Sequence, residues 1–123
     1  MRFLWFLPDY NRKMSDKIYK ICQIQEWQTA CIRGVYAGSK VDLQDGFIHF
    51  STKQQLNATA RKHFHSQRNL ILIEIDAKHL ELTWEHSRGG ELFPHLYHKL
   101  PITGSEKTWL LALDANKVPV LPF

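Results

Sequence analysis

The chain has 123 residues, of which 44% are hydrophobic and 23% are charged, with a formal net charge of +4. A chain of this size buries about two-thirds of its unfolded surface, so it fits one globular domain that needs no disulfide staples. Without an apolar run of about 18 residues or a basic stripe, the sequence indicates neither a membrane span nor a nucleic-acid surface.

Residues 1–16 are predicted to be a flexible extension in front of a single domain at 17–123. The segment opens with Arg2 and the apolar stretch 3–7. That stretch is too short for an export signal, and no small-residue cleavage site follows it. A second methionine, Met14, directly precedes the sequence SDKIYKI, which contains the start of the first regular element. We interpret the segment as a loosely docked tail or as the product of an upstream start codon.

The first regular elements are a strand and a helix. Alternating apolar residues predict the strand over 18–24. Apolar residues at helical spacing predict the helix over 25–33, and Gly34 is expected to end it. The two cysteines, Cys22 and Cys31, fall within these elements. They are too few for a disulfide framework, so we expect reduced thiols and a cytoplasmic location.

A loop over 35–45 is expected to lead into a short strand over 47–50. The two-residue period of a strand puts Phe47 and His49 on one face. His49 admits two interpretations. It is either a core histidine that bonds a neighbouring polar group, or it points into a pocket that binds or transforms a ligand.

The residues after His49 favour the pocket. Ser51 is predicted to cap a helix over 52–65, because Gln54 would complete a capping box. Ser51 and Thr52 then place hydroxyl groups and the free amides of a helix start next to His49, an arrangement that suits an anion.

The second half of the chain supplies the remaining strands. The continuous apolar run at 70–75 predicts a central strand that is covered on both faces. Further strands are expected at 82–85 and 108–113, with a rigid aromatic loop at 93–97 between them. Together the elements predict an α+β domain, a split mixed sheet of about five or six short strands with two helices.

A polar turn around Arg88 is the second candidate site. Arg88 precedes Gly89 and Gly90, so a guanidinium lies beside exposed backbone amides and suits a phosphate or carboxylate. Glu85 and Glu91 flank the turn as candidate bases. The alternative interpretation is a hairpin turn with solvated charges.

His95 and Tyr97 form the third candidate, because residues two apart in an extended segment share a face. They either line a pocket or cover the core. The histidine spacings match no metal motif, so we expect no metal, although a site from His49, Glu85 and His95 stays open as an alternative.

Three long segments and a following Leu-Pro resemble a bacterial family called domain of unknown function 952. The segments are IYKICQIQEWQTACIRGVYAGS, DGFIHFST and WEHSRGGELFPHLY. The resemblance covers residues 18 to 113. It implies an ADP-ribosyltransferase-like fold, with a cleft that holds NAD. FIHFST is also similar to the HIHF motif of RNA 2′-phosphotransferases.

The resemblance also implies roles for individual residues. Glu85 would be the transferase carboxylate, with Glu91 as the second choice. Lys20 stands where the superfamily has a histidine or arginine that holds the NAD ribose. Lysine donates hydrogen bonds but accepts none, so it does not replace histidine directly.

Three functional hypotheses follow. In the first, the protein is a small ADP-ribosyltransferase-like enzyme with NAD as substrate and Glu85 and His49 as catalytic residues. In the second, it is a non-catalytic module for a nucleotide or another phosphorylated small molecule. In the third, it is a metal-dependent hydrolase. The predicted ligand-binding residues are Lys20, Phe47, Ser51, Thr52, Arg88, Gly89, Gly90, His95 and Tyr97.

Overall fold

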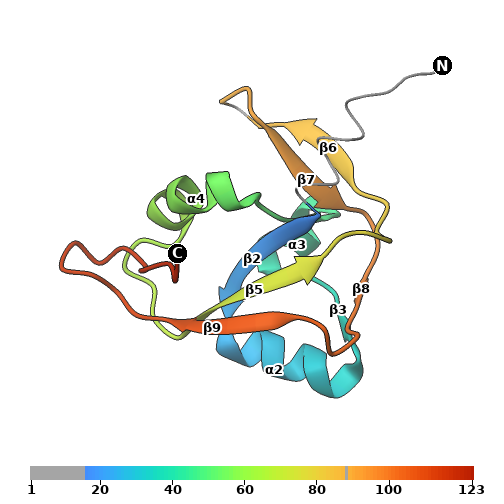
Figure 1. Ribbon diagram of the computed structural model, residues 1–123, viewed down its shortest axis with the longest axis horizontal. Helices are drawn as coiled ribbons and strands as arrows, with labels where there is room; N and C mark the ends of the chain where they lie inside the picture. Colours follow the sequence, from blue (N-terminus) through green and yellow to red (C-terminus); the bar gives the residue numbers. More distant parts are fainter. Residues whose placement is uncertain (1–15, 88) are drawn as a thin grey trace.

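The computed structural model describes residues 16–87 and 89–123, and these form an α+β fold with short strands in three small sheets (Figure 1). The helices are α2 (Ile24–Arg33), α3 (Lys40–Asp45) and α4 (Leu56–His63), with a 3-10 turn at Lys53–Gln55 in front of α4. The strands are β2 (Lys17–Gln23), β3 (Val35–Tyr36), β4 (Ile48–His49), β5 (Leu70–Asp76), β6 (Thr83–His86), β7 (Leu92–Leu96), β8 (Leu100–Pro101) and β9 (Lys107–Leu111). None of the helices in this part of the chain has the length and apolar character needed to span a membrane.

The largest sheet has β5 at its centre, antiparallel to β2 on one side and to β9 on the other (Figure 1). Successive side chains of a strand point to opposite faces of the sheet. Ile71 and Ile73 therefore enter one core cluster, whereas Leu70 and Leu72 enter another. The apolar side chains of β5 are thus buried in one core on each face of the sheet. The predicted central strand, covered on both faces, is confirmed.

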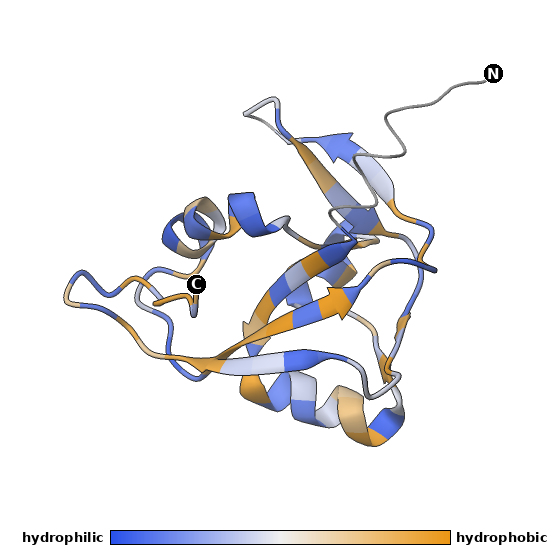
Figure 2. Cartoon of the chain, in the orientation of Figure 1, coloured by the Kyte–Doolittle hydropathy of each residue, from blue (hydrophilic) through white to orange (hydrophobic). Residues whose placement is uncertain are grey.

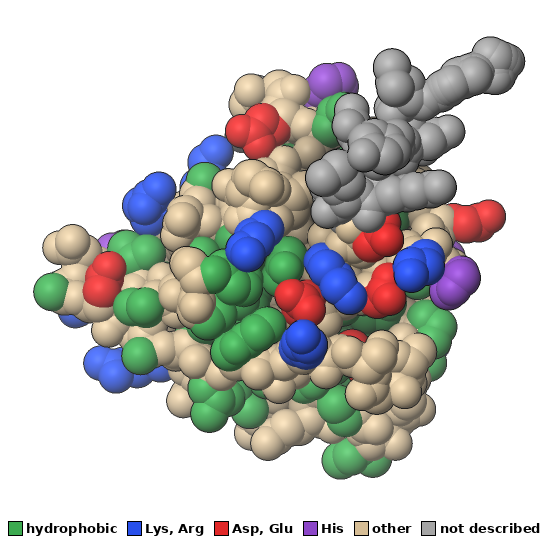
Figure 3. All heavy atoms as spheres, in the orientation of Figure 1, with side chains coloured by type: hydrophobic (Ala, Val, Ile, Leu, Met, Phe, Trp, Pro, Cys, Tyr) green, Lys and Arg blue, Asp and Glu red, His purple; other side chains and the backbone are tan. Residues whose placement is uncertain are grey.

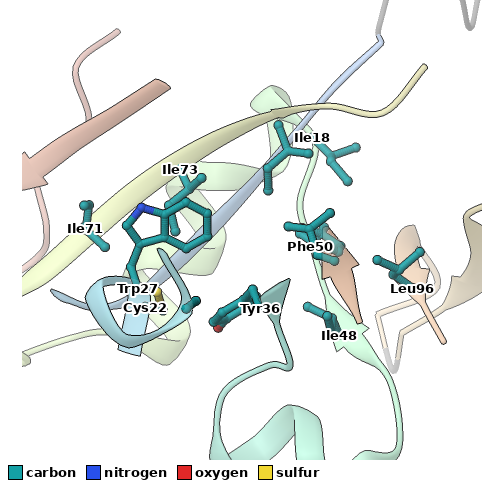
Figure 4. Packing of buried hydrophobic residues seen from close by; sticks show 12 residues of the cluster. Ile18, Cys22, Trp27, Tyr36, Ile48, Phe50, Ile71, Ile73 and Leu96 are labelled. Atoms are coloured by element: carbon teal, nitrogen blue, oxygen red, sulfur yellow. The ribbon is translucent and has the colours of Figure 1, made fainter. Parts of the chain in front are cut away.

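The larger core lies between this sheet, α2 and the strands that carry the candidate site. Trp27 of α2 packs against Tyr36 with ring centroids 5.8 Å apart. Figure 4 shows Trp27 beside Ile71 and Ile73, with Ile48, Phe50 and Leu96 at the far end of the cluster. This core joins the site strands to the largest sheet.

A smaller core fills the opposite face of the largest sheet. Leu56 and Ala60, which lie on one stripe of α4, pack there with Tyr19, Ile21 and the leucines of β5. Polar residues cover the outer side of α4, and apolar residues run along β2 and β5 (Figure 2). A helix therefore lies within the predicted range 52–65 and buries one side against the sheet.

The third sheet has the order β4-β7-β6, and β3 pairs with β8 in the second. β4 is short because the chain leaves β7 after Phe50. Ser51 then pairs with Tyr19 of β2 through two backbone hydrogen bonds of 2.8 and 2.9 Å. This crossover fixes the third sheet to the edge of the first.

Several predicted elements agree with the structure. The first strand, the first helix and the last strand lie within one or two residues of their expected bounds. Gly34 ends α2 in the left-handed conformation at a φ of 83°, as a helix stop requires. The predicted extension lies outside the described residues except for Asp16, whose carbonyl accepts a hydrogen bond from Ala77.

The sheet arrangement differs from the prediction. The sequence predicts one split mixed sheet, whereas the described strands form three small sheets in which every pair is antiparallel. Strand periodicity does not encode the direction of a partner, which is set by the connections. The α+β class is confirmed, and the ADP-ribosyltransferase-like assignment stays a prediction.

The expected loop at 35–45 is wrong, because it contains β3 and α3. Ser39 and Asp42 form a capping box that starts α3. Ser39 Oγ accepts a hydrogen bond from the Asp42 amide at 3.3 Å, and Asp42 Oδ2 accepts one from the Ser39 amide at 2.8 Å. The pattern Ser-x-x-Asp was present in the sequence as a signal for this helix.

The expected aromatic loop at 93–97 is also wrong, because residues 93–96 belong to β7, the middle strand of the third sheet, and only Tyr97 follows it. Pro94 argues against a central strand, since proline lacks an amide hydrogen. Here it lies just beyond the last pair between β7 and β4, and its carbonyl accepts a hydrogen bond from Phe50 at 3.0 Å. The missing donor therefore falls at the last contact between the two segments, just before Ser51 pairs with β2.

The predicted capping box is displaced by one residue. Thr52 and Gln55 form it, in place of Ser51 and Gln54. Ser51 is instead held in the crossover to β2. Hydroxyl residues at both positions made the two registers equivalent in sequence, and the pairing of Ser51 with Tyr19 selects between them.

Candidate functional site

Asp42 is a buried carboxylate on which four hydrogen bonds converge. Its side chain is only 2% exposed. Oδ2 accepts from the Lys20 ammonium at 2.7 Å and from the Ser39 amide, while Oδ1 accepts from His49 Nδ1 at 2.6 Å and from the His49 amide at 3.2 Å. Burial raises the pKa of this carboxyl, but the bonds from His49 and Lys20 outweigh it and hold the pKa well below the ordinary value.

The backbone before α3 leaves just enough room for this carboxylate. Gly38 has a φ of +109°, in the region that favours glycine. A Cβ atom at this position would come within 2.7 Å of Asp42 Cβ. The glycine therefore permits both the turn and the inward position of Asp42.

Lys20 lies beneath the site rather than on its surface. Its side chain is 8% exposed, and its ammonium donates to the His49 carbonyl at 2.8 Å in addition to its ion pair with Asp42. Two of its three hydrogens are thus used inside the fold. Lys20 of β2 therefore holds His49 in two ways. It donates to the His49 backbone carbonyl, and it binds the Asp42 carboxylate that in turn binds the His49 ring.

His49 is held between two carboxylates of α3. Nδ1 faces Asp42, and Nε2 lies 3.0 Å from Asp45 Oδ2. A carboxylate only accepts, so both bonds form together when both ring nitrogens carry a proton. The side chain is 35% exposed, which leaves one part of the ring open to a ligand.

A second carboxylate–histidine pair stands on the neighbouring strands. Glu85 Oε1 of β6 accepts from His95 Nδ1 at 2.6 Å and from the Tyr97 hydroxyl at 2.7 Å. These bonds lower the pKa of the Glu85 carboxyl, that from His95 first, and the bond to Glu85 raises the pKa of Tyr97. Glu85 is therefore a carboxylate with one oxygen already engaged twice.

Aromatic rings join the two pairs into one surface. Phe47 stacks on His95 at a centroid distance of 4.2 Å and lies 4.5 Å from His49 and 5.0 Å from Tyr97. His49 and His95 are opposite each other in the β4–β7 register, and their ring centroids are 5.2 Å apart. We call this set the histidine surface: Phe47, His49, Glu85, His95 and Tyr97.

The histidine surface exists because the same strands bury their other face. Ile48 and Leu96 alternate with His49, His95 and Tyr97 and enter the larger core. The predicted shared faces are therefore confirmed, for Phe47 with His49 and for His95 with Tyr97. The structure brings all five residues together although they come from segments that are far apart in the sequence.

Other predicted ligand residues are used within the fold. Ser51 Oγ lies 3.0 Å from Thr59 Oγ1, and the Thr52 hydroxyl accepts from the Gln55 amide. Gln55 in turn donates to Glu91 Oε1 at 3.0 Å. Glu91, the second candidate carboxylate, is thereby tied to the start of α4 and does not contact the histidine surface.

The turn after β6 is confirmed. The Gly90 amide donates to the Ser87 carbonyl at 3.0 Å, and the Gly89 amide lies 3.3 Å from Ser87 Oγ. Both glycines are exposed. Arg88 lies outside the described residues, so its predicted role stays a prediction.

Charges of both signs are interleaved over the face drawn in Figure 3, with apolar side chains between them. Within residues 16–87 and 89–123, no group of three or more His, Cys, Asp or Glu side chains is arranged to hold a metal ion.

Burial, together with the charge of Glu26, raises the pKa of Cys22 to about 12, which makes this thiol a poor nucleophile.

The described residues also border a cavity of about 300 Å³ at the start of α2. Its lining consists of Gln23, Ile24, Gln25 and Asn69. These side chains supply no titratable group.

Sequence reasoning missed Asp42 and Asp45. Both lie in α3, which was expected to be a loop. The Ser-x-x-Asp capping pattern could have located the helix, but it would not have shown that one carboxylate serves the cap and His49 together. That requires the return of β4 alongside α3.

The carboxylate of Asp42 predicts a specific loss of stability in acid. Because its pKa is depressed in the fold, its contribution is complete above the ordinary value of 3.8 and is lost as the pH falls below that value toward the folded pKa. We expect Asp42→Asn to flatten the decline of unfolding free energy below pH 4, measured by urea titration at successive pH values. An unchanged slope in the variant would contradict this.

Comparison with known proteins places the chain in a family. The model described as "Protein of unknown function (DUF952)" matches residues 21–108. The crystal structure of protein CC0527 from Caulobacter crescentus is similar, with 45% sequence identity and a TM-score of 0.79 over 85% of this chain and 93% of that chain. Its solution NMR structure gives 46% identity and a TM-score of 0.75 over 85% and 91%. No curated protein matches the chain. The chain therefore belongs to the DUF952 family of proteins of unknown function.

Proposed function

We propose that the protein binds an NAD-like nucleotide on the histidine surface and transfers its ADP-ribosyl group. The observation that carries the proposal is the ionised Glu85 among exposed and half-buried aromatic rings. Its Oε1 is held by His95 and Tyr97, and no hydrogen bond to Oε2 is found among the described residues. A fixed carboxylate with one free oxygen can stabilise the positive charge that develops on a ribose as its base departs.

The neighbouring groups fit the rest of such a ligand. Phe47 and Tyr97 offer ring faces for a base. His49 offers a ring that can bond a ribose hydroxyl in exchange for the exposed Asp45. The exposed Gly89 and Gly90 lie at the end of β6 beyond Glu85, where the proposal places the diphosphate. Ser51 and Thr52 support the site only by fixing the backbone after His49.

A second candidate function is non-catalytic binding of a nucleotide or another phosphorylated small molecule. Lys20 is the observation that favours it. The residue occupies the position that would hold the NAD ribose in the resembling superfamily, but its ammonium is engaged by Asp42 and the His49 carbonyl. Without a contact from residue 20 to the ribose, the histidine surface could still bind a nucleotide, but it would hold the reacting sugar less firmly.

Thermal unfolding of the full chain with NAD, ADP-ribose, AMP and inorganic phosphate tests binding. A ligand of the folded state stabilises it by about 2.7 kcal/mol at a hundredfold excess over its dissociation constant. We expect stabilisation by NAD and ADP-ribose, and its loss in His49→Ala. If no nucleotide shifts the midpoint, the proposal is wrong.

Glu85→Gln separates transfer from binding. The amide keeps the shape of the side chain and removes the charge, so we expect NAD to stabilise the variant as before while nicotinamide release falls by about a hundredfold. Glu91→Gln is the matched control, because Glu91 contacts Gln55, and it should leave release unchanged. Binding without nicotinamide release in the unsubstituted protein would select the second candidate.

A further inference from the structure

We infer that His95 is the general base of the proposed transfer and that the acceptor is a hydroxyl group, of water or of an alcohol. The inference rests on the proposed function and adds the acceptor class to it. It starts from the two histidines, which lie side by side but differ in the partners of their ring nitrogens.

His95 has one nitrogen engaged and one without a partner. Nδ1 donates to Glu85, so in the neutral ring Nε2 carries the lone pair. No hydrogen bond to Nε2 is found among the described residues, although the side chain is only 10% exposed. Phe47 stacks on the ring, and the Tyr97 hydroxyl holds Glu85 from a second direction. The lone pair is thus fixed in direction by carboxylate, phenol and phenyl ring together.

His49 cannot fill the same role in this arrangement. Both its nitrogens face carboxylates, Asp42 and Asp45, so its hydrogen-bonded form has no lone pair to accept a proton. His49 is suited to donate to an oxygen of the ligand, whereas His95 is suited to accept a proton. The difference comes from the number of carboxylates that each ring faces.

The bond between ribose C1′ and the nicotinamide nitrogen breaks, and its electron pair leaves with nicotinamide. The acceptor oxygen forms a bond to C1′, and its proton moves to His95 Nε2. Glu85 Oε2 stabilises the ribosyl cation between the two events. A carboxylate acceptor has no proton to lose, so a positioned base indicates an acceptor that carries one, as the hydroxyl of water or of an alcohol does.

His95→Asn gives a sharp test in the full chain. The asparagine amide nitrogen replaces Nδ1 and can still donate to Glu85, whereas nothing replaces Nε2. We expect NAD to stabilise this variant as it stabilises the unsubstituted protein. Nicotinamide release should fall by about a hundredfold or more, the usual contribution of a general base. His98→Asn is the matched control, because His98 is exposed and, among the described residues, bonds only the neighbouring Lys99 carbonyl; it should change neither quantity.

The reaction products complete the test. With methanol added, methyl ADP-ribose should form beside ADP-ribose, whereas acetate should give no adduct.

Each other outcome has a definite meaning. Unchanged release in His95→Asn or an acetate adduct overturns the base assignment. NAD binding without release in water or methanol also overturns it and leaves nucleotide binding intact. Absence of NAD binding overturns the proposed function and this inference with it.

Discussion

Replacing Asp42 with alanine is expected to destabilise the fold by about 3–5 kcal/mol, the usual effect of removing one partner from a buried ion pair. The change leaves the Lys20 ammonium buried and without its counter-charge, and it removes a helix cap and the anchor of the His49 ring. Urea unfolding followed by tryptophan fluorescence measures the loss.

Asp45→Asn provides the control for this experiment. Asp45 also contacts His49, but its side chain is 47% exposed, and exposed pairs contribute about 0–1 kcal/mol. Replacing both members of the buried pair, as Lys20→Met with Asp42→Leu, should cost less than Asp42→Ala alone, because no charge is left unpaired. Equal losses for Asp42→Ala and Asp45→Asn would show that burial does not govern this cluster.

Leu72→Ala is expected to destabilise the fold by about 2–5 kcal/mol, since it removes a large side chain from a closed core. Leu72 has no exposed surface and lies at the middle of β5, between β2 and β9. Its side chain fills the smaller core against α4. The cavity would open where the helix meets the sheet.

Leu110→Ala on the adjacent strand is the matched control. Leu110 is 73% exposed, so the same truncation should change the unfolding free energy by about 0.5 kcal/mol or less. Similar losses of unfolding free energy in the two leucine variants would contradict the position of β5 between the two cores.

The sequence was informative wherever one periodicity determined an element. The run at 70–75 has no polar interruption before Glu74, and only a strand with two apolar faces accounts for it. The alternation of His95 and Tyr97 likewise determined their common face, even though the segment was expected to be a loop. Local pattern thus predicted which residues would share the histidine surface.

The sequence was uninformative where a side chain serves two elements at once. Asp42 caps α3 and also binds His49 and Lys20, which arrive from β4 and β2. Each neighbour is separated from it by a different stretch of chain, so no single spacing records the cluster. The choice between Ser51 and Thr52 as the helix cap likewise depends on the backbone pairing of Ser51 with Tyr19, a residue 32 positions earlier in the chain.

The close approach of Gly38 to Asp42 implies a constraint on sequence drift. A side chain at position 38 would collide with the Cβ of residue 42, for any residue there other than glycine, unless the turn moves. Substitution at position 38 should therefore be accepted only together with rearrangement of α3, and with it of the carboxylate that holds His49. Relatives that have lost glycine here should also have lost the acidic residue at position 42, and in them the histidine on β4 would be free to change. Joint loss of the glycine and the acidic residue would identify the members of the family in which this site no longer functions.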